Sequence, residues 1–419
     1  MARAPDRTAL GVFAKPVWRP TLAAVAFAGL WITAILSRFG WETHGVRLRL
    51  SEALAVAIVL VAAFVLRRRL VFWPAILLPL AYVAVETFST LLNRADWGRG
   101  LKLDLLLAIE ALIAIGAAYL VNLIDARTVA RVIVGVGVVE SLAAIGISAL
   151  FLVHATDFGV QIDGSTFQCK VYGTMYEANL LASYLGAVLV FLFATRRLIG
   201  PNWVQAGAAA TITVAIGLTL TRAAWLAILA GVVTLLGLRV IRRTPTQLGE
   251  VISGVVLLGL LAGAAVVVIT AANAGICGHP NVPWSQGASI TGRFANQAIA
   301  LDEWKTSPLV GLGTGSVRGR QPGDPNLPWI SSMALETLHD TGLIGLIVVI
   351  VLIAALLRGL IIRRDLSDGR LAVRDGIAAA IIVLLIAFQA TTGTLMEYPW
   401  LFAGTALGLV FASRRPLAE

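Results

Sequence analysis

The sequence predicts an all-helical membrane protein that crosses the bilayer about twelve times. Of its 419 residues, 58% are hydrophobic and only 13% are charged, and the mean hydropathy is +0.86. Soluble proteins carry about 25% charged residues, so this chain has more apolar surface than a soluble domain can bury. Lipid tolerates no open sheet edge, and runs of ~20 apolar residues have the length of a membrane-spanning helix.

Twelve apolar runs are candidates for membrane spans, and they follow one another without a separate soluble unit. The second and the eighth are short, so their limits are the least defined. The runs are residues 20–37, 50–66, 70–92, 103–123, 130–153, 177–195, 203–221, 223–238, 251–272, 342–361, 376–396 and 398–413. We therefore expect residues 1–419 to form a single integral membrane domain.

The net charge of +10 reflects membrane topology rather than a nucleic-acid partner. Cytoplasmic loops attract Lys and Arg. If the N-terminus is cytoplasmic, most of the 33 basic residues fall on the inner side, in short segments. These segments are 3–19, 67–69, 127–131, 196–197, 239–243, 358–374 and 414–415. We expect a multi-pass protein of the cytoplasmic (inner) membrane, surrounded by lipids, with both termini in the cytoplasm and no nucleic-acid partner.

The same topology places four loops outside the cytoplasm, at 38–49, 93–102, 154–176 and 273–341. The last is far longer than an ordinary connection, and such loops are usually functional or disordered. It contains Trp284, Phe294, Trp304 and Trp329 together with an amphipathic run, which favours ordered short helices. The sequence therefore predicts a large extracytoplasmic loop at 273–341 that roofs an active site.

Both cysteines, Cys169 and Cys277, lie in the two largest outer loops. An extracytoplasmic location permits disulfides, so we expect a Cys169–Cys277 bridge, with two separate thiols as the alternative. No His or Cys cluster has metal-ligand spacing, and no Walker-type glycine loop is present. The sequence thus indicates neither a metal nor a cofactor.

Arg222 is the charged residue most at odds with its surroundings. It separates two apolar runs with almost no loop between them, at the outer membrane boundary. Ionisable groups at membrane depth are costly and usually functional, and a guanidinium is suited to phosphate. The alternatives are an arginine that extends to the interface from a helix end, or one paired with Glu110 or Glu140.

Two further polar groups lie where outer loops enter the membrane. Glu177 and Asn179 could cap a helix or line a site. Glu336, His339 and Asp340 are spaced i, i+3 and i+4, so they share one face of a helix that ends near Gly342. His is the commonest proton shuttle, whereas a solvated polar face is the alternative reading.

Four motifs follow one another along the chain: "GTMYEANLLASYL", "TLTRAAWLAI", "TGRFANQAIALDEWKTSPLVGLGTGSV" and "SSMALETLHDTGLIGL". In this order they resemble the O-antigen ligase and O-antigen polymerase superfamily. The first has Glu177 and Ala178 where the family usually has Asn-Pro. The resemblance covers residues 170–350.

The resemblance implies a metal-independent membrane glycosyltransferase of the GT-C type. Such proteins move a glycan from a polyprenyl-pyrophosphate carrier to an acceptor hydroxyl at the outer face of the membrane, for assembly of cell-envelope polysaccharide. The acceptor is a lipid-linked sugar in ligases and a growing glycan in polymerases. Carried over by motif, Arg222 and Arg293 would hold the pyrophosphate. Gly313 and Gly315 would let the backbone turn beside the donor, unless they form an ordinary loop turn.

The general base differs from the family pattern. The family has a His where this chain has Ser331, and His339 follows later on the same predicted helix. We expect His339 to be the base, with Glu336 as its alternative or orienting partner and Asp340 behind them. Two other classes stay open: a solute or anion transporter, and a non-catalytic scaffold in envelope assembly.

Overall fold

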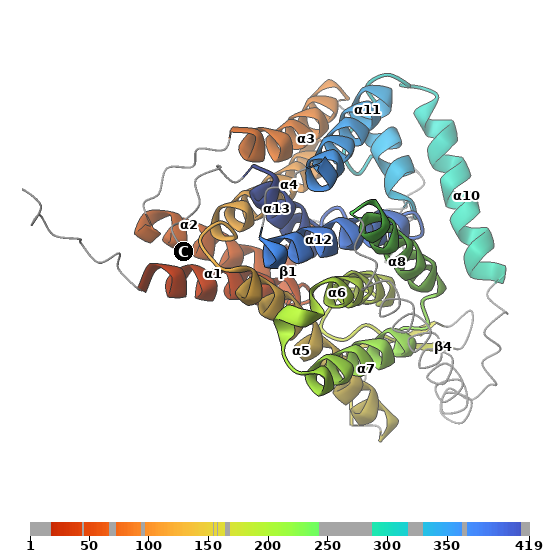
Figure 1. The fold of residues 1–419 in the computed structure, drawn as a ribbon. Helices are drawn as coiled ribbons and strands as arrows, with labels where there is room; N and C mark the ends of the chain where they lie inside the picture. Colours follow the sequence, from red (N-terminus) through yellow and green to blue (C-terminus); the bar gives the residue numbers. More distant parts are fainter. Residues whose placement is uncertain are drawn as a thin grey trace, which may run out of the picture.

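The computed structural model describes residues 18–43, 46–66, 73–93, 97–153, 155–156, 158–163, 168–242, 287–316, 330–362 and 367–411. These residues form a bundle of twelve helices (Figure 1). The helices are α1 (Trp18–Ala34), α2 (Leu50–Leu66), α3 (Trp73–Leu92), α4 (Trp97–Leu120), α5 (Ala126–Leu152), α6 (Ala178–Ile199), α7 (Asn202–Leu218), α8 (Arg222–Ile241), α10 (Gly287–Trp304), α11 (Met333–Ile362), α12 (Asp368–Ala387) and α13 (Glu397–Phe411).

Each predicted span that the structure describes overlaps a helix, although the last nine residues of the span 376–396 form a turn after α12. The ninth span, 251–272, lies outside the described residues. Among the residues that the structure describes, six helices are long and apolar enough to cross a membrane. They contain Ala75–Leu92, Gly98–Leu120, Ala126–Leu152, Ala178–Ile199, Arg222–Ile241 and Met333–Ile362. The chain is therefore a mostly helical, multi-pass membrane protein, whereas the total of twelve spans and the GT-C class stay predictions.

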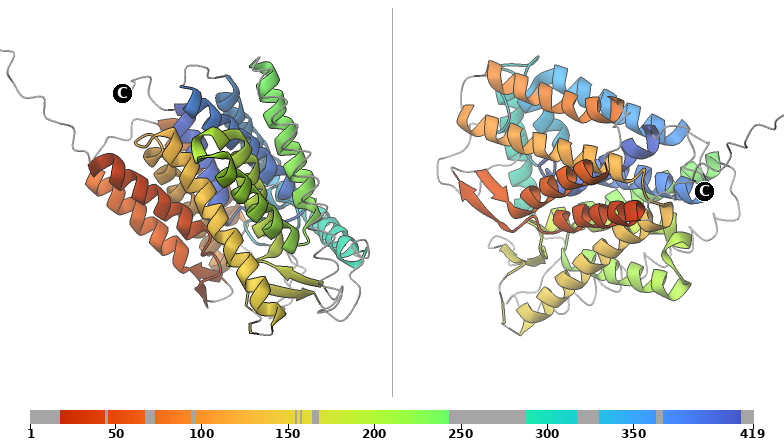
Figure 2. Two further views of the ribbon diagram at one scale, coloured as in Figure 1. Left: turned by 60° about the horizontal axis from the view of Figure 1, so that its bottom comes forward. Right: turned by 90° about the vertical axis from the view of Figure 1, so that its left-hand side faces the viewer.

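Two short β-hairpins were not predicted. Strands β1 (Gly40–Thr43) and β2 (Val46–Arg49) pair antiparallel, as do β3 (Val160–Asp163) and β4 (Gln168–Val171). Both hairpins lie in predicted outer loops rather than in apolar runs, so the rule against open sheet edges in lipid still holds. Figure 2 shows both hairpins and α10 at the same end of the bundle.

Helix α6 is the centre of the bundle. Its apolar window is 89% buried, and it packs against α5, α7, α8 and α12. Its middle, residues 185–194, is apolar on every side, as expected for a helix that is surrounded by other helices. The buried hydroxyls of Ser183 and Tyr398 lie 2.8 Å apart and join α6 to α13 by a hydrogen bond. Helix α6 thereby provides a fixed frame for the helices that carry the polar groups.

Small residues allow α13 to approach α4 closely. A Cβ on Gly404 would lie 2.2 Å from the Ala114 carbonyl oxygen, and one on Gly408 would lie 2.5 Å from that of Ala118. Glycines four residues apart on one helix face are a common way for membrane helices to pack backbone against backbone. The position of α13 along α4 is therefore fixed by the close contact of these two glycines with the α4 backbone.

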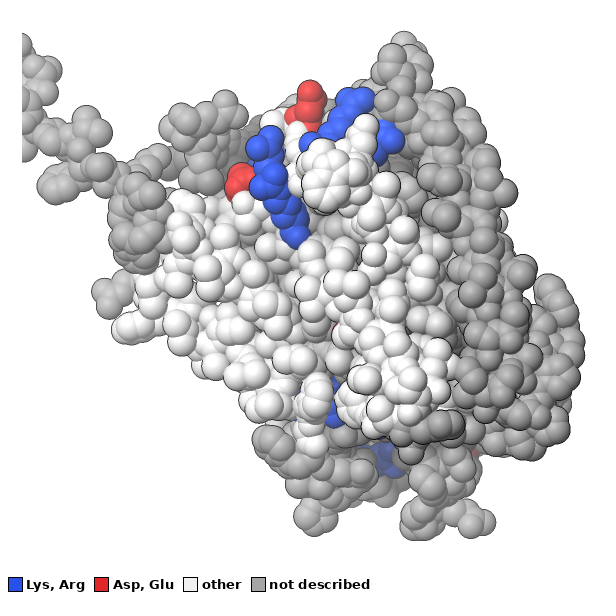
Figure 3. All heavy atoms as spheres, turned by 90° about the horizontal axis from the view of Figure 1, so that it is seen from below, with Lys and Arg blue, Asp and Glu red and all other residues white. Residues whose placement is uncertain are grey.

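Charged side chains are rare on the middle of the described bundle. Figure 3 shows Lys, Arg, Asp and Glu at one edge of the molecule, further Lys or Arg side chains near the opposite end, and a broad band without charged side chains between them. Helix α12 begins earlier than the predicted span 376–396, because its charged first turns are compensated: Arg242 pairs with Asp375 at 2.7 Å. The uncharged band fits the hydrocarbon region of a bilayer.

Helix α11 contains a break at Gly342, where the sequence predicted a helix end. Gly342 has φ 66° and ψ −166°, a backbone conformation open essentially to glycine alone. A Cβ at this position would lie 2.4 Å from the carbonyl carbon and oxygen of Leu309. The polar first part of α11 and its apolar second part therefore meet at a glycine that no other residue can replace without strain.

We expect Gly342→Ala to destabilise the protein by roughly 1–3 kcal/mol or more, since both the backbone conformation and the contact with Leu309 oppose a Cβ. Thermal unfolding in detergent measures the effect. Gly207→Ala in α7 is the matched control, because no heavy atom lies within 4 Å of a Cβ there. Equal unfolding temperatures for the two variants would contradict this account of the break.

Candidate functional site

Arg222 begins α8 directly after a tight turn. Helix α7 ends at Leu218, Thr221 is the N-cap of α8, and Leu220 between them has φ 53°. A non-glycine residue with positive φ is uncommon and persists only where the surroundings hold it. The Thr219 hydroxyl supports the turn by donating to the Ile216 carbonyl at 2.7 Å. The expected junction without a loop is confirmed, and it fixes where the Arg222 side chain leaves the backbone.

The residues Glu177 and Asn179 lie beside this junction. The Thr221 hydroxyl donates to the Asn179 side-chain oxygen at 3.2 Å, and Asn179 donates to Glu177. The turn before α6 is held by Glu140, which accepts hydrogen bonds from the backbone N–H (3.0 Å) and hydroxyl (2.5 Å) of Thr174. The first two motifs of the sequence therefore meet in space, with Glu140 in a structural role.

Helix α10 presents one face to α11. Arg293, Gln297, Ala300 and Glu303 are spaced i, i+4, i+7 and i+10, which places them along one stripe. Three of them have contacts with the start of α11 or the residues before it. Ala300 is fully buried in a small apolar cluster with Ile330 and Leu335, and Gln297 donates to the Ser331 carbonyl at 3.4 Å. Arg293 thus lies on the side of α10 that faces the bundle.

Ser331 is placed at the contact between α10 and the start of α11, through its backbone carbonyl. Its neighbour Ser332 donates to the Gln389 side-chain oxygen at 3.1 Å. Two residues after Gln389, Thr391 donates to Glu177 at 3.5 Å. The turn that follows α12 therefore connects the α11 side of the site with the Glu177 side.

A glycine-rich turn crosses the break in α11. Gly311, Gly313 and Gly315 all have positive φ, at 72°, 88° and 70°. Hydrogen bonds between backbone groups run in both directions at the crossing. Leu312 and Gly313 donate to the carbonyls of His339 and Asp340 at 2.9 Å, while Leu343 and Ile344 donate to those of Pro308 and Leu309 at 2.9 and 3.1 Å. The glycine turn and α11 are therefore one structural unit, which explains the glycines without a ligand.

His339 is enclosed between two carboxylates. Its Nδ1 lies 2.7 Å from Asp340 and its Nε2 lies 3.1 Å from Glu303 of α10, and its side chain is 0% exposed. Neutral imidazole has one N–H donor. Both contacts are therefore hydrogen bonds only if both ring nitrogens, or one of the carboxyl groups, carry the additional proton. We call Glu303, His339 and Asp340 the clasp.

His339, the expected base, has a side chain that is buried in the structure. Asp340 and His339 lie inside the protein because the glycine turn covers them. Asp340 also accepts from the Gly315 N–H at 3.1 Å. Of the three residues on this face, Glu336 is the one that is only half-buried. Which of them acts as a base stays a prediction.

A cluster of carboxyl groups beneath the glycine turn was not predicted. The Thr314 hydroxyl lies 2.7 Å from Asp104 and 3.1 Å from Glu86, and both carboxyl side chains are buried. One hydroxyl has one hydrogen to donate. Both contacts are hydrogen bonds only if the second carboxyl group holds a proton and donates in turn. The sequence could have indicated Glu86, because it is a charged residue within an apolar run. No local pattern connects Asp104 with Thr314.

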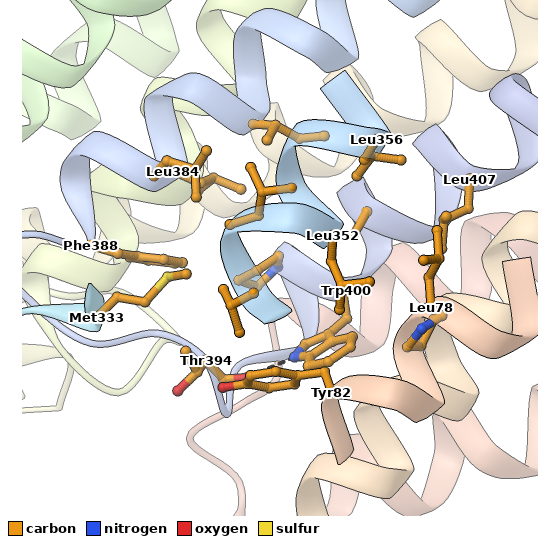
Figure 4. Close-up of a pocket in the computed structure, with 17 residues that line it drawn as sticks. Leu78, Tyr82, Met333, Leu352, Leu356, Leu384, Phe388, Thr394, Trp400 and Leu407 are labelled. Atoms are coloured by element: carbon orange, nitrogen blue, oxygen red, sulfur yellow. Dashed lines mark hydrogen bonds between the residues drawn. The ribbon is translucent and has the colours of Figure 1, made fainter. Parts of the chain in front are cut away.

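An apolar groove begins beside this cluster and runs between α3, α11, α12 and α13 (Figure 4). At one end it is lined by Tyr82, Met333, Phe388 and Trp400, and the rings of Tyr82 and Trp400 lie 5.9 Å apart. Tyr82 is hydrogen-bonded to Glu86 and interacts electrostatically with Glu336. The groove therefore continues from a polar mouth into the apolar interior of the membrane region.

The fold and these contacts define a helical membrane protein with a polar site at one end of the bundle. Residues 207–350 match the family model described as O-antigen ligase. The match supports the O-antigen ligase superfamily that the motifs indicated, and it includes Arg222, Arg293 and the clasp. No curated protein matches the chain. Over residues 207–350 the chain is thus similar to the O-antigen ligase family.

Cys169 lies on β4 and takes part in a disulfide. Cys277 is outside the described residues, so the pairing of the two stays a prediction. We expect both thiols to resist alkylation in native membranes and to react after reduction, because a bridge would tie the β3–β4 hairpin to the long loop. Mass mapping without reductant measures this pairing. Free reaction of both thiols before reduction would contradict it.

Proposed function

We propose that this protein is a metal-independent glycosyltransferase without a cofactor. It transfers a glycan from a polyprenyl-pyrophosphate carrier to an acceptor hydroxyl at the outer face of the cytoplasmic membrane. The observation that carries the proposal is the placement of the two motif arginines. Arg222 is fixed at a helix junction, and Arg293 lies on the inward stripe of a helix that packs on the motif-bearing α11.

The arginines supply the charge that the reaction requires. The acceptor oxygen attacks the anomeric carbon of the donor sugar, and the bond from that carbon to the pyrophosphate oxygen breaks. The electron pair leaves with the polyprenyl pyrophosphate. Guanidinium groups remain charged at any physiological pH and match phosphate with two parallel donors. Preorganised cations at the site of developing charge are usually a large contribution to catalysis.

The proton of the acceptor hydroxyl requires a base, and the geometry favours Glu336. This carboxylate is half-buried and lies one helical turn before the clasp. His339 has contacts to carboxylates on both ring nitrogens and reaches no acceptor while the clasp is closed. We therefore assign the base to Glu336 and a structural role in the site to His339.

The groove fits the carrier lipid. Its lining is apolar beyond Tyr82 and Thr394, and it begins beside the carboxyl groups of the site. A branched hydrocarbon chain gains free energy by contact with such a lining rather than with water or polar groups. A carrier chain in the groove would place its pyrophosphate at the polar mouth, which is where the site requires it.

One observation favours transport as a second candidate function. Glu86, Asp104 and Asp340 are buried around the glycine turn, and carboxyl groups at membrane depth are a feature of proton relays. Transport requires alternating access, whereas the glycine turn and α11 are joined by backbone hydrogen bonds. The transfer assay with a purified lipid-linked glycan separates the two functions.

We expect Arg222→Ala and Arg293→Ala each to lower glycan transfer by ~10²–10³, because one preorganised charge is lost. Lys at either position should restore little, since a point charge cannot bind phosphate through two parallel donors. Transfer by purified protein is the measurement. Lys305→Ala is the control, since its ammonium is 62% exposed and pairs with Asp302 on the surface. Full transfer by both arginine variants would refute the proposed mechanism.

We expect Glu336→Gln to lower the rate of transfer by ~10² or more while the lipid donor still binds, because a base acts on the acceptor. Ser331→Ala should have a small effect, since the Ser331 backbone carbonyl makes the contact with Gln297. Single-turnover rates and donor affinity measure the two effects separately. A strong loss of rate with unchanged donor affinity for His339→Gln, and none for Glu336→Gln, would return the base to His339.

A further inference from the structure

Helix α10 rests mainly on α11, and its contacts are distributed along one stripe. Arg293 is at one end of the stripe, the Ala300 contact with Ile330 and Leu335 is in the middle, and Glu303 is at the other end. At 1.5 Å per residue, Glu303 lies ~15 Å along the helix from Arg293. Glu303 therefore acts on Arg293 only through the position of the helix.

The clasp is the most strongly polar contact along the stripe. The Glu303 side chain is 17% exposed and meets a histidine that is 0% exposed. Hydrogen bonds between charged groups in such surroundings are stronger than those between neutral groups. Asp302, the preceding residue, offers the contrast: its carboxylate is 75% exposed and pairs with Lys305, also on the surface. Exposed pairs of this kind contribute little.

If the clasp opened, the resulting displacement of α10 would be larger at Arg293 than at Glu303. The Ala300 contact lies between the two residues, roughly twice as far along the helix from Arg293 as from Glu303. If α10 pivots at Ala300, a displacement at Glu303 is roughly doubled at Arg293. Displacements of ~1 Å in a site can change rates by ~10²-fold.

We propose that Glu303 is a positioning residue for the pyrophosphate site. By closing the clasp on His339 and Asp340, it fixes the tilt of α10 and so the place of Arg293 over the bundle. The effect on catalysis rests on the proposed transferase function, whereas the effect on α10 does not. Glu303 itself touches neither donor nor acceptor in this proposal.

Hydrogen exchange of the α10 amides tests the structural half, with the full-length protein in detergent or nanodiscs. Glu303→Gln keeps the size of the side chain and removes its charge. We expect α10 amides to exchange at least roughly tenfold faster in Glu303→Gln, because a neutral amide replaces the carboxylate in the hydrogen bond with His339 and weakens it. The adjacent Asp302→Asn removes the same charge from an exposed position and should leave the exchange unchanged. Equal exchange in wild type and Glu303→Gln would overturn the proposal.

A double-mutant cycle tests the link to Arg293. Glu303→Gln should lower transfer by up to ~10²-fold in the wild-type background. In the Arg293→Ala background it should have almost no further effect, because the group that it positions is absent. Additive losses would overturn the link, since they would show that Glu303 acts elsewhere. If Arg293→Ala alone retained full transfer, the proposed function would fail, and the exchange experiment would still decide whether the clasp holds α10.

Discussion

The crossing of the glycine turn over the break at Gly342 is the contact on which the rest of the site depends. Its hydrogen bonds join backbone to backbone, so the crossing is independent of side-chain conformation. The close approach requires that Gly311 and Gly342 lack a Cβ. Once the two segments cross, Thr314 is brought to the carboxyl cluster and Asp340 to the Gly315 N–H. The polar residues thus take their positions from a contact between residues without side chains.

The local features of this architecture could be predicted from the sequence. Apolar runs of helical length predicted the spans, and an isolated arginine predicted the α7–α8 junction. A glycine after a polar helical run predicted the break in α11. Each of these signals is contained within one stretch of chain. The expectation that Arg222 and Arg293 act together comes from the family motifs, because no local pattern relates two residues in different helices, and it stays a prediction.

The contacts between distant segments could not be predicted in this way. From the sequence, Glu303 is a solvated carboxylate in a loop, and only the structure shows that it contacts His339. Asp104 reads as one charge near a helix start until Thr314 is placed above it. Helical spacing placed Glu336, His339 and Asp340 on one face, but a face shared by three polar residues does not reveal what covers that face. Here the cover comes from a turn whose own sequence is mostly glycine and small polar residues.

The groove beside the site has a consequence for the range of carriers that the protein can use. Apart from Tyr82, Thr394 and Trp400, whose indole N–H already donates to the Thr394 carbonyl, its lining is apolar and cannot distinguish one isoprene unit from the next. Hydrophobic contact depends on the area covered and not on direction. Recognition of the carrier would therefore stop at the first few units, and chains of different total length would be equivalent once the groove is filled. Selectivity would then be confined to the polar mouth, where sugar and pyrophosphate are held.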